Sequence, residues 1–171
     1  MNIIKFIPYN NGDLYWKNNI YSGKGGLRIK AGSKAGGVSY FNKYKIQYKY
    51  VTYQGKMYKV HRLIFLMFNG YLTEYITYKD GNILNTRIEN LIEANKSEIN
   101  SKIKLFSNNK SHIKGVCFHK KTNKWVAQIT KSGKHIHLGV FNTKEEAEKV
   151  YLEAKEKYFG NFLDKCKVVN G

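Results

Sequence analysis

Runs of mixed apolar and polar residues mark most of the first sixty positions as β-strands. From residue 13 to about residue 59, β-branched and aromatic side chains alternate with polar ones, most clearly over residues 45–51 and 57–60. Gln54-Gly55-Lys56 lies between these two runs and predicts a hairpin turn, while the glycine-rich stretches at 23–26 and 36–37 predict loops or bulges. The pattern therefore predicts a β-rich N-terminal region.

Two short helices are predicted after these strands. Residues 61–68 are apolar nearly all round, which indicates a short buried helix that ends at Asn69-Gly70. Residues 86–93 are expected to form a second helix after the turn at residues 80–82. Residues 95–111 are polar, rich in Asn, Lys and Ser, and have no strong periodicity, so they are interpreted as a linker.

The last sixty residues carry the pattern of three strands followed by one helix. Strands are predicted at 115–119, 124–130 and 134–139, with Ser132-Gly133 turning the second into the third. Thr143 and Glu146 have the spacing of a capping box at the start of the helix. Its sheet-facing side is expected to carry Ala147, Val150, Tyr151, Ala154 and Tyr158.

Side-chain alternation assigns the two faces of this predicted sheet. The side chains expected to face the helix are Trp125, Ala127, Ile129, Ile136 and Leu138. Those expected to point away from the helix are Val126, Gln128, Thr130, His135 and His137. The outward face is therefore predicted to be polar, with two histidines on one strand.

Net charge is the most informative feature of the composition. Thirty Lys and Arg against twelve Asp and Glu give a formal charge of +18, whereas a solubility charge on a small domain is about 2 to 8 units. Such an excess favours a polyanionic partner, either nucleic acid or an anionic membrane surface. No apolar run reaches the roughly 18 residues that span a bilayer, and Cys117 and Cys166 are too few for a disulfide framework or a zinc knuckle. The sequence therefore predicts a soluble, cytoplasmic protein without a membrane partner.

Charge is also unevenly distributed within the C-terminal region. Residues 99–144 contain ten lysines and no acid, whereas five glutamates occupy the predicted helix. One face of the sheet is thus left positive, and a sheet that presents Lys, His and Gln can enter a major groove and meet phosphates and base edges. His135 and His137 can also chelate a metal, but no Cys or carboxylate ligand accompanies them in the sequence, so double-stranded DNA is the expected ligand and no metal or other cofactor is expected.

A set of motifs in a fixed order runs through the C-terminal region: residues 111–116, 124–129 and 137–147, then Tyr151, and the closing Phe159-Gly160 and Phe162. With these motifs the region resembles the Apetala-two or ethylene-response-factor DNA-binding domain. The resemblance implies that the outer sheet face reads the major groove through Lys114, Cys117, His119, Gln128, Thr130, His135 and His137. Arginine stands at several of these positions in plant members of the family, so the residues present here imply a weaker or different sequence preference. The complete set of expected DNA-binding residues is Lys102, Lys104, Lys110, Lys114, His119, Lys120, Lys121, Lys124, Gln128, Thr130, His135 and His137.

The middle of the chain resembles the HNH endonucleases of phages and mobile introns, through residues 60–64 and 80–91. The resemblance implies a ββα-metal fold in which a histidine base, an adjacent aspartate and a later helical residue serve one divalent cation. Here Tyr78 stands at the position of the base, Thr77 at that of the aspartate and Ile99 at that of the later helical residue. The central Asn90 is retained. The ordinary pKa of tyrosine is about 10, so at neutral pH it is a poor base, whereas histidine, with a pKa of about 6.5, would serve. The expectation is a degenerate centre with no catalytic residue and no metal.

Two other arrangements of this centre remain open. His61 can act as the base with Asp80, Glu89 or Glu93 as metal ligands, although a structural role for His61 is the preferred interpretation. A one-residue shift of the last position would make Asn100 a ligand while leaving Thr77 and Tyr78 in place.

The predicted fold class is α+β. It comprises an N-terminal β-rich HNH-like domain of the ββα-metal type, with its metal site lost, and a C-terminal three-stranded antiparallel sheet with one helix. The predicted boundaries are residues 1–98 for the HNH-like domain, 99–112 for a Lys/Asn/Ser linker and 113–171 for the Apetala-two-like domain.

Three functional hypotheses follow. The first is a phage-encoded DNA-binding or regulatory protein that descends from an HNH homing endonuclease, no longer cleaves, and acts in the cytoplasm of the infected bacterial host. The second is an inhibitor of host machinery such as RNA polymerase or a sigma factor, which is suggested by aromatic residues outside the motifs, although core packing is their preferred role: Tyr9, Tyr15, Trp16, Tyr21, Tyr40, Phe41 and Tyr44. The third is an active nickase with a variant centre.

Overall fold

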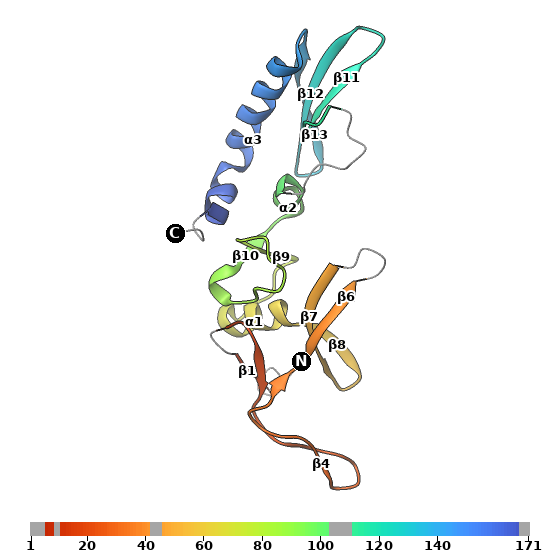
Figure 1. Cartoon of the computed structure of the whole chain (residues 1–171). Coiled ribbons are helices and arrows are strands. Elements are labelled where there is room, and N and C mark those ends of the chain that lie inside the picture. The colour runs from red at the N-terminus through yellow and green to blue at the C-terminus, as the bar shows by residue number, and fades with distance from the viewer. Residues whose placement is uncertain (1–5, 9–10, 42–45, 103–110, 168–171) are drawn as a thin grey trace. The chain divides into compact units, whose positions relative to one another are not determined.

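The computed structural model describes the chain except for residues 1–5, 9–10, 42–45, 103–110 and 168–171 (Figure 1). Its residues divide into two compact units, one that contains residues 1–93 and one of residues 94–165. Small sheets and three α-helices make up the described part of the chain, which confirms the predicted α+β class. None of the described helices is long and apolar enough to cross a membrane.

The first unit is built from short strands, as predicted. The strands are β1 (Phe6–Pro8), β2 (Leu14–Trp16), β3 (Ile20–Tyr21), β4 (Leu27–Ile29), β5 (Lys34–Ala35), β6 (Gly37–Phe41), β7 (Ile46–Tyr53) and β8 (Lys56–Lys59). β6, β7 and β8 form an antiparallel sheet, and the turn at Gln54-Gly55 joins β7 to β8 with positive φ angles of 50° and 73°, which confirms the predicted hairpin. β1, β2 and β5 form a second antiparallel sheet, and β3 pairs with β4 in a two-stranded ribbon.

The predicted buried helix is confirmed as α1 (Val60–Asn69). It ends at Gly70, whose φ of 77° is left-handed and whose N–H donates to the Leu66 carbonyl, a usual glycine termination. Leu63, Ile64 and Phe65 of α1 are buried in a core that also contains Val51 of β7. The apolar surface of α1 thus packs against the surrounding strands, as expected for a buried helix.

The predicted helix over residues 86–93 is wrong. A 3-10 turn, η3 (Ile88–Asn90), is followed by β10 (Leu91–Ala94), which pairs with β9 (Tyr75–Tyr78). The Asn90 side chain donates to the Asn85 carbonyl at 2.7 Å and accepts from the Asp80 N–H at 3.0 Å, so it closes the loop between β9 and β10. This long-range bonding ends the helical turn, and Leu91 takes extended backbone angles that place it in the core.

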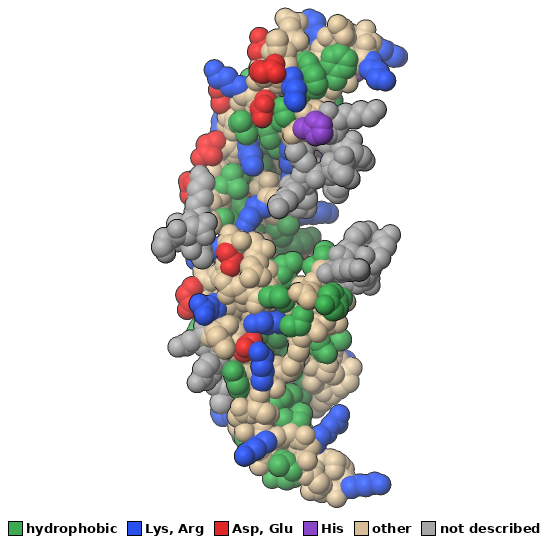
Figure 2. Space-filling model, in the orientation of Figure 1, with side chains coloured by type: hydrophobic (Ala, Val, Ile, Leu, Met, Phe, Trp, Pro, Cys, Tyr) green, Lys and Arg blue, Asp and Glu red, His purple; other side chains and the backbone are tan. Residues whose placement is uncertain are grey.

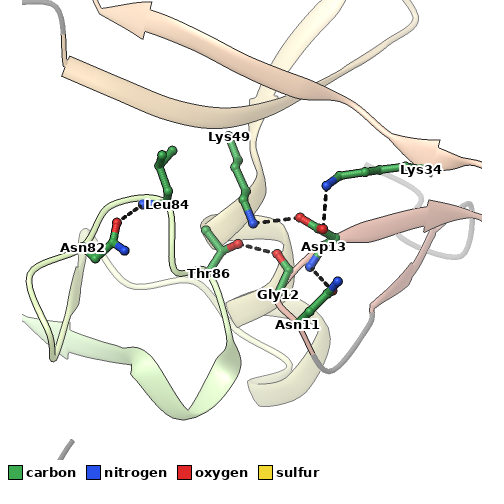
Figure 3. Close-up of polar contacts among 8 residues, drawn as sticks. All are labelled: Asn11, Gly12, Asp13, Lys34, Lys49, Asn82, Leu84 and Thr86. Atoms are coloured by element: carbon green, nitrogen blue, oxygen red, sulfur yellow. Dashed lines mark hydrogen bonds and ion pairs between the residues drawn. The ribbon is translucent and has the colours of Figure 1, made fainter. Parts of the chain in front are cut away.

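A polar lock joins the N-terminal strands to the loop after β9 (Figure 3). The buried hydroxyl of Thr86 donates to the Gly12 carbonyl. At Gly12, φ is +78° and an added Cβ would lie 2.4 Å from the Arg87 nitrogen, so only glycine permits this approach. Next to it, the buried Asp13 carboxylate accepts from Lys34 Nζ at 2.6 Å and Lys49 Nζ at 2.7 Å. The N-terminal strands therefore belong to the same packed unit as the HNH-like motif.

Acid is expected to destabilise the first unit through Asp13. Burial by itself raises the pKa of this carboxyl, but the hydrogen bonds and charges of Lys34 and Lys49 outweigh it and hold the pKa below its ordinary value. A depressed folded-state pKa gives stability that is present above the unfolded pKa of about 3.9 and is lost as pH falls through the folded value. In thermal unfolding followed from pH 7 to pH 3, Asp13→Asn should lower stability by about 2 kcal/mol at pH 7 and by less at pH 3. An equal loss of stability at both pH values would show that the charge of the Asp13 carboxylate does not stabilise the first unit.

The second unit contains the predicted sheet and helix. β11 (Val116–His119), β12 (Lys124–Lys131) and β13 (Lys134–Phe141) form an antiparallel sheet in that order, and α3 (Lys144–Lys167) follows. The capping box is confirmed, because the Glu146 N–H donates to Thr143 Oγ1 and the Thr143 N–H to Glu146 Oε2, both at 3.3 Å. Ala147, Tyr151 and Ala154 are buried against the sheet, as expected.

A further helix, α2 (Lys96–Lys102), occupies the first part of the expected linker. It begins at a reciprocal cap, in which the Glu98 N–H donates to Asn95 Oδ1 at 3.0 Å and the Asn95 N–H donates to Glu98 Oε2 at 2.7 Å. At the other end of the expected linker, the buried Ser111 hydroxyl donates to the Ile113 carbonyl at 2.9 Å. Residues 99–102 and Ser111 are therefore ordered parts of the second unit, and Lys104 and Lys110 lie outside the described residues.

Candidate nucleic-acid interface

The strand register places the expected DNA-binding side chains on one face of the β11–β13 sheet. Across β12 and β13, Gln128 pairs with His137 and Thr130 with His135, and across β11 and β12, His119 pairs with Lys124. All six side chains are exposed, whereas Ala127 and Ile129, which alternate with them on β12, are buried against α3. The structure thus brings His119, Lys124, Gln128, Thr130, His135 and His137 together on the face away from α3.

Hydrogen bonds hold two of the histidines in place on this outer face. His135 Nδ1 lies 3.0 Å from Thr130 Oγ1, and His119 Nδ1 lies 2.9 Å from Thr122 Oγ1. Each bond occupies the Nδ1 atom, so the Nε2 atom of each exposed ring is the one left to meet a ligand. An oriented imidazole loses less entropy on binding than a freely rotating one.

A bulge adds an apolar side chain, that of Val140, to the outer face beside Val126. Ala127 pairs with Gly139 and Gln128 with His137, so Leu138 is an extra residue in β13. The extra residue shifts the alternation, and Val140, paired with Val126, is 50% exposed on the outer side. Simple alternation from Leu138 assigns Val140 to the inside, so the sequence reasoning missed it. Apolar side chains at this place can meet the methyl group of thymine.

The lysines fall into two groups. Lys120 and Lys121 are exposed in the turn between β11 and β12 and extend the outer face. Lys114, by contrast, is half-buried and donates from Nζ to the Asn100 carbonyl, and burial, together with the nearby Lys155, lowers its pKa. Lys102 is half-buried at the end of α2. Acidic side chains gather along α3 instead, on the other side of the sheet (Figure 2).

The HNH-like motif places Tyr78 and Thr77 at the end of β9. Tyr78 is only 8% exposed, and its ring meets the His61 ring edge-on at a centroid distance of 5.4 Å. Burial raises the pKa of Tyr78 well above its ordinary value, and burial, with the charges of Lys59 and Arg62, lowers the pKa of His61 to about 4. The two rings pack in the interior, where both stay neutral at pH 7.

The nearest carboxylate in this motif is committed to hydrogen bonds. Asp80 accepts from the Asn82 N–H at 2.7 Å, from Asn85 Nδ2 at 2.7 Å and from Asn90 Nδ2 at 2.9 Å. Glu89 and Glu93 are exposed. In the described part of the chain, no three His, Cys, Asp or Glu side chains group together in a way that could hold a metal. The donor set around Thr77 and Tyr78 therefore does not fit the divalent ion that the HNH resemblance implies.

The remaining HNH position falls on α2. Ile99 is half-buried and offers a hydrocarbon side chain, and the adjacent Asn100 is exposed with its carbonyl bonded to Lys114. Both residues belong to the second unit, whereas Thr77 and Tyr78 belong to the first. Along the chain the order is β9, β10, α2, which is the order of a ββα motif.

Comparison with known families agrees with both halves of this description. Residues 111–161 match the family model of the AP2 domain, and residues 58–100 match that of an HNH endonuclease. No curated protein and no solved structure matches the chain. The chain thus combines an HNH endonuclease-like domain with an AP2 domain, an architecture of DNA-binding and nuclease proteins.

Proposed function

We propose that this chain is a phage-encoded DNA-binding protein that descends from an HNH homing endonuclease, no longer cleaves DNA, and works in the cytoplasm of the infected bacterial host. The observation that carries the loss of cleavage is the buried Tyr78 at the position of the general base. The phage origin follows from the HNH endonucleases that the middle of the chain resembles.

The chemistry of the three HNH positions supports the loss of activity. A general base must reach water in its unprotonated form, and the buried phenol of Tyr78 stays protonated at neutral pH. Thr77 supplies a neutral hydroxyl where a carboxylate would hold the cation, and Ile99 supplies no ligand atom. Loss of a general base alone lowers a rate by about 10²–10⁴. His61, the alternative base, packs against Tyr78, and the Asp80 carboxylate already accepts three hydrogen bonds.

DNA binding is assigned to the outer face of the AP2 sheet. Gln128 and His137 are side by side on that face and can meet base edges, while Lys120, Lys121 and Lys124 can meet phosphates at its edge. Lys102, Lys104 and Lys110 are proposed to follow the DNA backbone. The HNH-like domain then serves as a folded scaffold.

Wild-type protein is expected not to nick supercoiled plasmid in Mg²⁺ or Mn²⁺ above the level of Tyr78→Phe, which keeps the buried ring and removes the hydroxyl. Thr77→Val removes the hydroxyl at the metal-ligand position, and His61→Gln removes the imidazole of the alternative base. Gel electrophoresis of plasmid after incubation measures the result. Metal-dependent nicking by the wild type that any one of these three variants removes would contradict the proposal and support a variant nickase.

A second function, binding of host transcription machinery such as RNA polymerase or a sigma factor, is favoured by exposed aromatic residues outside both matched segments. Tyr21 and Tyr40 are each 60% exposed, whereas Trp16 is 5% exposed and belongs to the core. Tyr15 is half-buried, and Tyr9 and Tyr44 lie outside the described residues. A pulldown from nuclease-treated bacterial lysate, compared between wild type and Tyr21→Ser/Tyr40→Ser, tests this function, since a specific partner must be lost with the two rings.

A further inference from the structure

The N-terminal region has a charge pattern of its own, outside both matched families. Residues 14–57 contain nine Lys and Arg and no Asp or Glu. The family matches begin at residues 58 and 111, so neither accounts for this excess. Lys and Arg side chains also lie over the lower end of the face drawn in Figure 2, where no acidic side chain is visible.

An open groove of about 600 Å³ lies within this region. Arg28, Lys30 and Lys34 contribute its charged lining, and Tyr50 and Val51 of β7 also line it. Gly36 lines it as well; its φ is +86°, and an added Cβ would lie 1.8 Å from the Tyr50 carbonyl oxygen. The close passage of β5 and β6 over β7 therefore depends on glycine at this position.

The backbone holds the cations of the groove in defined places. β3 and β4 form a ribbon that extends from the β1–β2–β5 sheet (Figure 1). Ile20 pairs with Ile29 and Tyr21 with Leu27, so Arg28 is the extra residue of a bulge, a feature that re-aims a side chain. At the base of the ribbon, the Ala31 N–H donates to Asn19 Oδ1 at 2.7 Å, and the Gly32 N–H donates to the Trp16 carbonyl at 2.8 Å.

The described residues of the first unit neutralise only part of the positive charge at the groove. The single carboxylate of Asp13 is shared by Lys34 and Lys49, which leaves one positive charge in that cluster, and Lys34 remains 56% exposed. Arg28 and Lys30 are exposed and form no ion pair with any described residue. A groove with these cations and with no carboxylate among its described lining residues is suited to an anion that carries several charges at regular spacing.

We propose that this groove, with the β3–β4 ribbon beside it, binds the phosphodiester backbone of duplex DNA and gives the chain a second DNA contact that is separate from the AP2 sheet. A two-stranded ribbon has the width that a major groove admits. Lys24 at its tip, Arg28 in β4 and Lys30 directly after β4 lie where flanking phosphates can be met. The inference takes from the proposed function only that the ligand is DNA.

The test measures binding of the full chain to a random-sequence duplex by fluorescence anisotropy over a range of salt concentrations. Arg28→Gln/Lys30→Gln should weaken binding several-fold at 100 mM salt and reduce the slope of log K against log salt by about 1.8, since each phosphate contact contributes about 0.9. Lys149→Gln/Lys165→Gln removes the same charge and should leave both quantities unchanged, because these exposed side chains are on α3, which packs on the face of the AP2 sheet opposite the proposed DNA-binding face. Unchanged thermal unfolding is expected for both variants, since all four side chains are exposed.

The outcomes separate this inference from the proposed function. If Lys120→Gln/Lys121→Gln/Lys124→Gln on the AP2 sheet weakens binding and the groove variant binds as the wild type does, the groove proposal is wrong and the AP2 interface stands. If the groove and α3 variants lose equal DNA affinity, net charge alone determines binding, and the groove proposal is wrong. A loss confined to single-stranded DNA overturns the duplex ligand. If the wild type binds no DNA, both proposals fail.

Discussion

Replacement of Gly115 by alanine is expected to unfold the second unit or bring it close to unfolding. Gly115 precedes β11 with a φ of +73°, and an added Cβ would lie 2.3 Å from Tyr151 Cε2 and 2.4 Å from the Gln128 carbonyl oxygen. Tyr151 is 5% exposed in the core and Gln128 is part of the central strand, so neither can move freely. The left-handed backbone costs alanine about 1–2 kcal/mol, and the overpacking about 1–3 kcal/mol more.

The loss of folding free energy expected for Gly115→Ala is a large fraction of the stability of a small unit. Folded domains are stable by about 5–15 kcal/mol, and small ones lie near the lower limit. In a domain of 60–100 residues each 1 kcal/mol shifts Tm by about 4–8 °C, so a loss of about 2–5 kcal/mol should lower Tm by about 8–40 °C in circular-dichroism melting. Binding to DNA should fall with it, because the Gln128 N–H donates to the Gly115 carbonyl at 2.8 Å and both residues shape the strand that carries the outer face.

Gly133 provides the matched control. Its φ is +77°, close to that of Gly115, but an added Cβ would meet nothing within 4 Å. Gly133→Ala therefore has only the backbone cost, about 1–2 kcal/mol. Equal Tm decreases for the two variants would show that the packing of Gly115 against Tyr151 does not have the role assigned to it.

The AP2 half was predictable because its signals are local. A turn at Ser132-Gly133, alternation along β12 and the Thr143–Glu146 capping box each depend on residues a few positions apart, and the structure confirms all three. The prediction failed where a local rule was interrupted. Leu138 is an extra residue next to Gly139, whose φ is +144° and whose backbone lies under the Phe141 ring. Alternation alone does not reveal such a bulge, and Val140 was therefore missed.

The first unit was less predictable because distant residues determine it. Asp13 and Lys49 are 36 positions apart, and Thr86 and Gly12 are 74 apart, so no local pattern indicates either contact. The helix predicted over residues 86–93 gave way to a strand because Asn90 bonds back to Asp80 and Asn85. The HNH motif did locate Thr77 and Tyr78 in the sequence, but the burial of Tyr78 against His61 needed the structure.

Affinity for duplex DNA is expected to fall steeply with salt, and the two kinds of contact on the AP2 sheet should be separable by this dependence. Proteins with about 6–10 phosphate contacts lose about 10³–10⁵ in affinity between 50 and 200 mM salt. Lys120→Gln/Lys121→Gln/Lys124→Gln removes three exposed cations and should decrease the salt slope by about 2.7 on any duplex. These lysines are expected to meet phosphates, which carry no sequence information, so the loss should be uniform across sequences.

Gln128→Ala/His137→Ala should have the opposite signature. The paired side chains lie at the centre of the outer face, where base edges are expected, and a base contact contributes about 1–3 kcal/mol of discrimination. With duplexes recovered by in vitro selection and a random duplex of the same length, this variant should lose about 10-fold or more on the selected sequence, keep its affinity for the random one, and retain the wild-type salt slope. A uniform loss with a reduced slope would place Gln128 and His137 at the backbone, and the AP2 sheet would then bind DNA without reading its sequence through these two residues.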